Sequence, residues 1–149
     1  MEVISNHNWA LTVGTFLPLV GVLIMLFIPK AEEALIKSVA IATAIATLAV
    51  GIYTMVQFDF GNAGSMQFVA QHDWISVIKS SYYIGIDGIS LPLYLLSMVI
   101  TVLVMIYSWD HVPSPGNPKA FFILMLILQT GMAGTFIARD LILFFVFFE

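Results

Sequence analysis

The sequence predicts an all-α protein, a polytopic bundle of transmembrane helices. Of its 149 residues, 60% are hydrophobic and 9% are charged, and the mean hydropathy is +1.01. A soluble domain carries about 25% charged residues on a surface that must face water. Long uncharged apolar runs recur along the chain, and backbone groups within lipid must be paired inside helices or closed barrels. These runs are too long and too uniform for barrel strands, which alternate in polarity.

The composition excludes several classes of protein. A soluble enzyme is excluded because five basic and nine acidic residues cannot cover a water-facing surface. A nucleic-acid binder is excluded because the net charge is −4 and no basic patch is present to meet phosphates. The absence of cysteine removes disulfides, thiolate metal sites and iron–sulfur ligation. The three histidines, at positions 7, 72 and 111, are too scattered to predict a metal site.

Four runs are long enough to cross roughly 30 Å of hydrocarbon, which takes about 20 helical residues. We expect these spans at residues 10–28, 38–58, 88–108 and 120–138. A fifth apolar run covers 141–149 and rises about 13 Å as a helix. A helix of that length leaves Glu149 near the middle of the bilayer. We therefore expect the sequence to be an N-terminal fragment of a longer polytopic protein.

The connections between the spans predict the orientation of the chain. Basic residues favour the cytoplasmic side, and an external N-terminus places three of them inside and two outside. The inside residues are then Lys30, Lys37 and Lys119, and the outside residues are Lys79 and Arg139. No basic segment precedes the first run, which argues against a cleaved signal peptide.

The connection at residues 59–87 is the only sizeable segment outside the spans. Within it, residues 66–79 mix apolar and polar side chains. Two interpretations stay open, a segment that lies along the membrane interface and a partly extended cap over the helix ends.

Glu149 is the first candidate for chemistry. It follows the apolar stretch LILFFVFF, and an ionised carboxylate at that depth costs about 3 kcal/mol on insertion scales. A membrane protein keeps such a group when it pairs with a cation, faces a hydrated cavity or is protonated, and such a group suits a proton relay. The alternative is a structural ion pair, or a residue near the far interface in a tilted helix.

Three further charged residues lie at the ends of predicted spans. Asp87 stands at the start of the third span, where a carboxylate caps free amides and is stabilised by the helix dipole. Arg139 and Asp140 form a polar step between the fourth and fifth spans, which predicts an interfacial anchor and an N-cap. A place in a proton path is the alternative for each of them.

The fourth span carries the polar residues Gln129, Thr130 and Thr135. We expect them to hydrogen-bond to neighbouring helices, as polar residues do in membranes, and a hydrated proton path is the alternative. Gly131 and Gly134 in the same span would let another helix pack closely there.

Two motifs carry a family resemblance. YYIGIDGISLPLYLLS, residues 82–97, resembles the proton-pumping membrane subunits of respiratory NADH–quinone oxidoreductase (complex I), most of all the subunit called chain M. RDLILFFVFFE, residues 139–149, resembles that family's D-L-x-x-F-[FY]-x-[FW]-[FW]-E stretch, which ends in a membrane-embedded glutamate. The resemblance covers the whole sequence, which would be about the first third of a typical family member.

The resemblance implies a parent with about fourteen transmembrane helices, including two inverted repeats of about five helices each. It implies that Glu149 pairs with a lysine on a later broken helix and takes part in proton translocation. It also implies that NADH, flavin, iron–sulfur clusters and quinone are bound by partner subunits and that no cofactor is bound by this chain. The expected partners are neighbouring antiporter-like membrane subunits and the lipid bilayer. Because no organelle targeting segment is visible, a bacterial cytoplasmic membrane is the simplest location.

The sequence therefore predicts a non-redox, proton-translocating subunit of NADH–quinone oxidoreductase. Three alternatives stay open. The first is a subunit of a multi-subunit sodium/proton antiporter, which works without redox partners. The second is a structural membrane scaffold in which Glu149 is only an assembly ion pair. The third is a photosynthetic relative that accepts electrons from ferredoxin, because the electron donor leaves no mark on this chain.

Overall fold

Residues 3–4, 7–113 and 115–149 are described by a computed structural model of helices and one small sheet. The helices are α1 (Trp9–Phe27), α2 (Glu33–Gln57), α3 (Ser90–Tyr107), α4 (Pro118–Ile137) and α5 (Leu141–Phe148). The strands are β1 (Val3–Ile4), β2 (Met66–Ile75) and β3 (Ser80–Ile86), with 3-10 turns η1 (Phe60–Asn62) and η2 (Ser76–Ile78).

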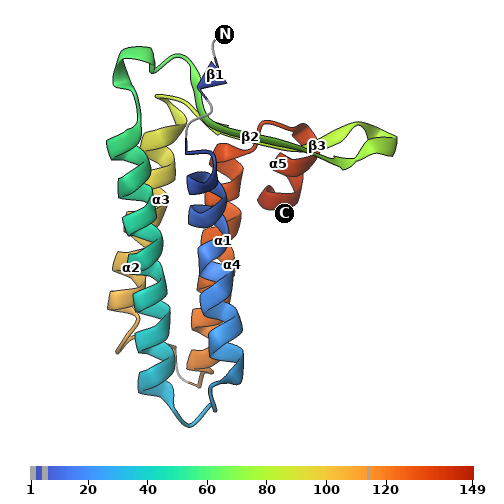
Figure 1. Cartoon of the computed structure of the whole chain (residues 1–149). Coiled ribbons are helices and arrows are strands. Elements are labelled where there is room, and N and C mark those ends of the chain that lie inside the picture. Colours follow the sequence, from blue (N-terminus) through green and yellow to red (C-terminus); the bar gives the residue numbers. More distant parts are fainter. Residues whose placement is uncertain (1–2, 5–6, 114) are drawn as a thin grey trace.

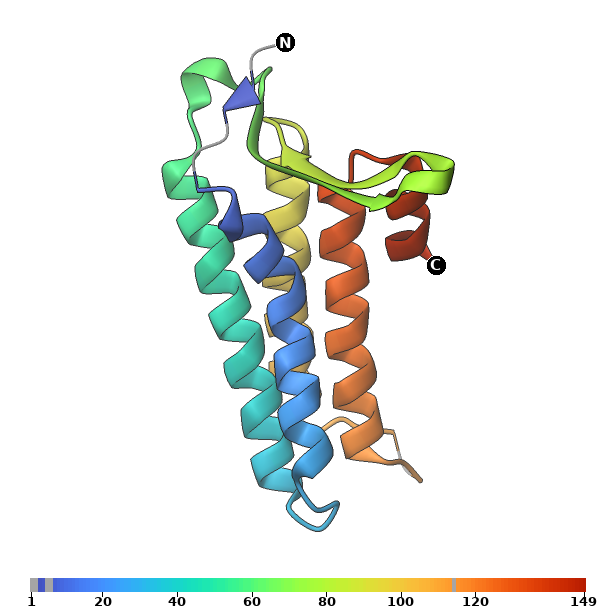
Figure 2. The ribbon, with the colours of Figure 1, turned by 45° about the vertical axis from the view of Figure 1, so that its right-hand side comes forward.

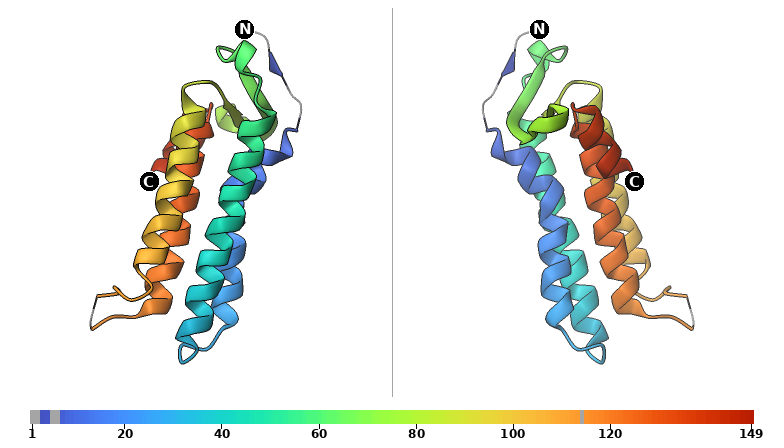
Figure 3. Two further views of the ribbon diagram at one scale, coloured as in Figure 1. Left: turned by 90° about the vertical axis from the view of Figure 1, so that its left-hand side faces the viewer. Right: turned by 90° about the vertical axis from the view of Figure 1, so that its right-hand side faces the viewer.

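The four long helices form an antiparallel bundle (Figure 1). Each helix packs against the next one, α1 packs against α4 to close the ring, and α2 also contacts α4 across the centre. The α1–α2 pair stands beside the α3–α4 pair (Figure 3). All four helices are long and apolar enough to cross a membrane. The predicted helical membrane bundle is confirmed, and the chain is a multi-pass membrane protein.

The helix boundaries fall within two residues of the expected spans, except at the start of α2. The uncharged run predicts a start at residue 38, but the helix begins at Glu33. The apolar run reports only the part of a helix that lies in hydrocarbon, whereas charged residues can prolong the helix into water. Ile36 is fully buried in this extra turn, so packing against the neighbouring helices stabilises it.

The connection between α2 and α3 folds into an antiparallel hairpin of β2 and β3, and β1 adds to β2 in parallel. The extended form that one of the two interpretations expected is confirmed, since the segment is a hairpin whose inner half packs on the helix ends. The hairpin begins above the bundle and extends sideways past α5 (Figure 2). Phe68 in its inner part is buried, whereas Trp74 and Val77 near its tip are 49% and 92% exposed. The inner half of the hairpin therefore belongs to the protein core and the tip projects from it.

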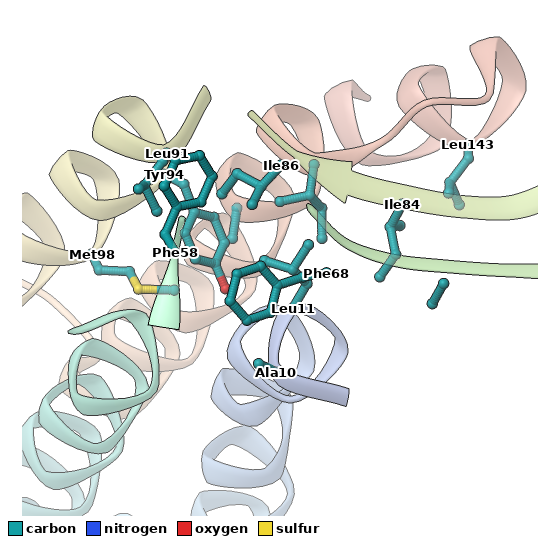
Figure 4. Packing of buried hydrophobic residues seen from close by; sticks show 13 residues of the cluster. Ala10, Leu11, Phe58, Phe68, Ile84, Ile86, Leu91, Tyr94, Met98 and Leu143 are labelled. Atoms are coloured by element: carbon teal, nitrogen blue, oxygen red, sulfur yellow. The ribbon is translucent and has the colours of Figure 1, made fainter. Parts of the chain in front are cut away.

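Buried apolar side chains form two clusters. The cluster beneath the hairpin joins Ile84 and Ile86 of β3 to Leu11 of α1 and Tyr94 of α3 (Figure 4). The second cluster fills the other half of the bundle, around Met25, Ile36, Ala44, Met105, Phe122 and Leu126. Buried polar residues lie between them along the helices, among them Thr15, Thr47, Thr101, Gln129 and Thr130. The hairpin is thus held on the helices by the same hydrophobic packing that holds the helices together.

Candidate functional site

The connection between α4 and α5 is attached to the edge of the hairpin. Ala138 forms an antiparallel bridge with Ile84 of β3, and the backbone amide of Arg139 donates to the carbonyl of Tyr83 at 2.8 Å. The two residues that follow α4 thus add a short segment to the edge of the sheet. This attachment, which we call the α4–α5 corner (residues 138–140), determines where α5 begins.

The Arg139 side chain reaches from this corner to the start of α3. Its Nη2 donates to Asp87 Oδ2 at 3.3 Å and to Ser90 Oγ at 3.2 Å, and its Nε donates to the Gly85 carbonyl at 3.3 Å. The sequence predicts an interfacial anchor at Arg139 and does not indicate this ion pair. The order of the spans indicates that the two residues can meet, because the start of the third span and the end of the fourth lie at the same membrane face.

Asp87 caps α3, as its position in the sequence predicts. Its Oδ1 accepts hydrogen bonds from the backbone amides of Ile89 at 3.0 Å and Ser90 at 2.8 Å. Burial opposes ionisation of this carboxyl, but the hydrogen bonds from Ser90 and Ile89 and the charge of Arg139 outweigh it, so the pKa of Asp87 lies below its ordinary value. The carboxylate is therefore charged at neutral pH and joins α3 to the α4–α5 corner.

Asp140 is the N-cap residue of α5, also as predicted. Its Oδ1 accepts from the amides of Ile142 at 2.9 Å and Leu143 at 3.1 Å. The same carboxylate accepts from the Ser80 hydroxyl at 3.0 Å and from the Ser81 amide at 3.2 Å. The hydrogen bond from Leu143, together with those from Ser81, Ser80 and Ile142, holds the pKa of Asp140 below its ordinary value against the effect of burial.

Glu149 follows the last turn of α5, and its amide donates to the Phe145 carbonyl. Because α5 runs back alongside α4 for eight residues, Glu149 lies about 12 Å along the bundle from the α4–α5 corner. It lines a cavity of about 730 Å³ together with Thr130 and Thr135 of α4. The other lining residues, from α1, α4 and α5, are Phe16, Leu19, Leu124, Ile127, Leu128, Gly131, Met132, Phe136, Val146, Phe147 and Phe148.

Glycines on α4 allow α5 to come this close. A side chain at Gly134 would collide with the Phe147 ring, and one at Gly131 would lie 3.1 Å from the Phe147 carbonyl oxygen. The expectation that these glycines admit a closely packed helix is confirmed, since that helix is α5.

The expectation of hydrogen bonds to neighbouring helices is wrong for Thr135 and stays a prediction for Gln129 and Thr130. Thr135 donates to the Gly131 carbonyl of its own helix at 2.8 Å, and not to a neighbouring helix. Gln129 and Thr130 are buried, and their side-chain polar atoms form no hydrogen bond within the part of the chain that the structure describes. The physical reason is that a threonine hydroxyl reaches its own helix carbonyl more easily than a second helix.

Lysines hold the opposite end of the bundle. Lys119 donates to the carbonyls of Leu26 and Ile28, at 3.1 and 2.7 Å, at the end of α1. Lys37 donates to the Trp109 carbonyl at 2.7 Å, and its ammonium lies 5.7 Å from the Trp109 ring centroid. Carbonyls at the C-terminal end of a helix lack partners inside the helix, so these cations stabilise them.

Metal binding finds no support in the arrangement of side chains. Within residues 3–4, 7–113 and 115–149, no three His, Asp or Glu side chains gather as ligands for an ion. His7 Nδ1 lies 3.0 Å from the Tyr53 hydroxyl, and the His111 ring stacks on Tyr107 with centroids 4.3 Å apart. The titratable residues of interest are therefore Asp87, Asp140 and Glu149.

Comparison with known families decides what kind of protein has this arrangement. The family described as "NADH-ubiquinone oxidoreductase chain 4, amino terminus" matches residues 13–133, which include α3, most of α4 and the whole hairpin. The chain belongs to this family. The resemblance noted from the two sequence motifs is confirmed.

Relatives in the family are named for different electron donors. NAD(P)H-quinone oxidoreductase chain 4-3 of Nostoc sp. is 34% identical over 93% of this chain and 24% of its own length. NADH-ubiquinone oxidoreductase chain 4 of Arabidopsis thaliana is 33% identical over 89% of this chain and 26% of its own length. F(420)H(2) dehydrogenase subunit M of Methanosarcina mazei is 33% identical over 70% of this chain and 21% of its own length. The chain thus spans about a quarter of these relatives, less than the third that the resemblance implied.

Proposed function

We propose that this chain is part of a proton-translocating, non-redox membrane subunit of an NADH–quinone oxidoreductase. Membership of the chain 4 family supports the proposal, because the relatives are named as quinone oxidoreductases and a related dehydrogenase. The observation that carries it is the place of Glu149, a carboxyl in an otherwise uncharged cavity beside a transmembrane helix.

The chemistry that we propose for Glu149 is reversible protonation. An apolar surrounding favours the neutral acid, and a cation brought close favours the carboxylate, so a change in the charge nearby loads or releases one proton. In this proposal, Glu149 meets that cation, a lysine, in a later part of the subunit. The Thr135 hydroxyl oxygen, whose proton is donated to the Gly131 carbonyl, can accept a hydrogen bond from water in the same cavity.

The rest of the complex completes the proposal. Flavin, iron–sulfur clusters and quinone are bound by partner subunits, which is consistent with the absence of cysteine from these 149 residues. The neighbouring partners are other antiporter-like membrane subunits, and the location is a bacterial cytoplasmic membrane. The relatives are named for NADH, NAD(P)H and F(420)H(2), so the donor of this complex is a separate question that purified complex answers directly.

Glu149→Gln in the full-length subunit tests the proposal. Sealed vesicles are assayed for NADH oxidation and for proton uptake by dye quenching, both normalised to the amount of assembled complex. We expect loss of proton uptake in a complex that still assembles. Glu33→Gln, at an exposed position at the other end of the bundle, is the matched control and leaves both activities unchanged.

Other outcomes identify the alternatives. Normal pumping by each assembled Glu149→Gln complex, with less complex present, points to the structural scaffold. Parental vesicles without any NADH-driven signal, but with sodium-dependent proton exchange, point to the sodium/proton antiporter. Turnover with reduced ferredoxin in place of NADH identifies the photosynthetic relative.

A further inference from the structure

The carboxylate of Asp140 forms more hydrogen bonds than an N-cap requires. Two of its four bonds, from the amides of Ile142 and Leu143, satisfy the first turn of α5. The other two come from the Ser80 hydroxyl and the Ser81 amide at the outer end of β3. One carboxylate therefore ties the helix and the hairpin together.

Arg139 fastens the inner part of the same strand. Its amide donates to the Tyr83 carbonyl, and its Nε donates to the Gly85 carbonyl. Two consecutive residues thus bind β3 from Ser80 to Gly85, over most of the length of the strand. Because β3 pairs with β2 over its length, the first turn of α5 is attached to a sheet and not to a loose loop.

This attachment has a direct effect on Glu149. Helix α5 contacts α4 and β3, and its Phe147 ring packs 6.0 Å from the Phe16 ring of α1. Eight residues of continuous helix join Asp140 to Glu149, so a shift or rotation of the first turn of α5 is carried to Glu149, about 12 Å away. Among the described residues that line the cavity, Glu149 is the titratable one, and the others are apolar or carry a hydroxyl group.

We propose that Asp140 is a positioning residue, whose carboxylate locks the β2–β3 hairpin to the first turn of α5 and thereby sets the place of Glu149 in its cavity. The proposal rests on the proposed function, since it assigns a means of placing the carboxyl that takes up the proton. Asp140 itself carries no proton in this scheme. In this proposal the hairpin holds the first turn of α5 in place, and through it Glu149.

The test separates the two duties of Asp140. Asp140→Asn keeps an oxygen that can cap α5, but it puts an NH₂ group where the Ser81 amide needs an acceptor. Ser80→Ala removes one hairpin bond and leaves both α5 bonds. Ser38→Ala is the control, because the Ser38 hydroxyl donates to the Ala34 carbonyl of its own helix on an exposed face.

The readouts are protons pumped per NADH oxidised and the pH profile of pumping, measured in sealed vesicles with the assembled complex. For Asp140→Asn we expect the ratio to fall about twofold or more and the profile to shift, because misplacing a reacting group by about 1 Å costs up to about a hundredfold in rate. Ser80→Ala should change the ratio and the pH profile in the same direction, but to a smaller extent. Ser38→Ala should change neither the ratio nor the profile. In a Glu149→Gln background, Asp140→Asn has no further effect on pumping.

The outcomes distinguish this inference from the proposed function. Normal pumping by Glu149→Gln overturns the proposed function and the inference with it. Impaired pumping by Glu149→Gln, combined with a normal ratio and an unchanged pH profile in Asp140→Asn, overturns the inference alone. If Asp140→Asn does not assemble, Ser80→Ala decides, and an unchanged ratio and profile in that variant contradict the positioning role.

Discussion

Arg139 and Asp87 form an ion pair at 3.3 Å although 52 positions separate them in the sequence. Each side chain is 27% exposed, so the pair lies near the surface at this end of the bundle and is partly shielded from solvent. It joins the end of α4 to the start of α3, beneath the hairpin. Both residues also hold other elements, Asp87 the first turn of α3 and Arg139 the carbonyl of Gly85.

Removing one partner of this pair is expected to destabilise the protein. Arg139→Gln loses the charged hydrogen bonds to Asp87 and Ser90, which are worth about 1–3 kcal/mol. Asp87→Asn keeps an oxygen that can cap α3, but it removes the charge and puts an NH₂ group where Arg139 Nη2 needs an acceptor. Thermal unfolding of the purified complex measures both variants, and the double variant should be less destabilised than the sum by about 1 kcal/mol. Strict additivity would show that the pair contributes nothing to stability.

Gly134→Ala is expected to displace α5, because the new methyl group collides with the Phe147 ring. Overpacking of this kind costs about 1–3 kcal/mol. The melting temperature and the amount of assembled complex should fall, and Phe147→Leu in the same chain should restore part of the loss. Gly64→Ala is the control, since nothing lies within 4 Å of the added methyl group. Equal effects at the two glycines would contradict the close approach of α5.

Acid is expected to weaken the bundle end that carries Asp87. The folded-state pKa of this carboxyl lies below its ordinary value of 3.8, so the charged form stabilises the fold. That contribution is present at pH values above about 4 and is lost as the pH falls through the lowered pKa. The difference in melting temperature between the parent and Asp87→Asn should therefore be constant from about pH 7 to about pH 5 and close at lower pH. A difference that persists unchanged in acid would show that the carboxylate charge is not responsible.

The orientation in the membrane is expected to follow the basic residues. The end of the bundle with Lys30, Lys37 and Lys119 faces the cytoplasm by the positive-inside rule, and the hairpin end faces outward. Single cysteines test this in a full-length protein whose other cysteines are replaced. Gly64→Cys should react with an impermeant maleimide in intact cells, and Asp110→Cys only after permeabilisation. The reverse pattern would place the hairpin in the cytoplasm.

Much of the fold is readable from the chain because lipid imposes a simple rule. A run of about 20 uncharged apolar residues has few alternatives to a membrane-spanning helix, so the four spans follow from composition. The start of α2 at Glu33 was not predictable in this way, since charged residues outside the hydrocarbon continue or end a helix according to what they contact. Asp87 and Asp140 were recognisable as caps because capping is a local interaction between near neighbours in sequence.

The hairpin was less predictable than the helices. Residues 66–79 mix apolar and polar side chains in a way that suits an interfacial segment as well as a strand, and neither choice could be made locally. Burial of Phe68 against the helix ends decides it, and that contact exists only after the bundle has formed. The hydrogen bonds that Gln129 and Thr130 are expected to make to other helices depend in the same way on which helix faces meet, and they stay a prediction.

The sequence alone determined the membrane class, the helical spans and the family motifs, and it made Glu149 a candidate, because each depends on local composition or on spacing along one segment. Tertiary structure decided the partnership of Arg139 with Asp87, the attachment of Asp140 to Ser80 and Ser81, and the cavity that Glu149 shares with Thr130 and Thr135. These relationships join residues about 14 to 60 positions apart. They appear when antiparallel helices return the chain to the same end of the bundle, which local sequence patterns do not encode.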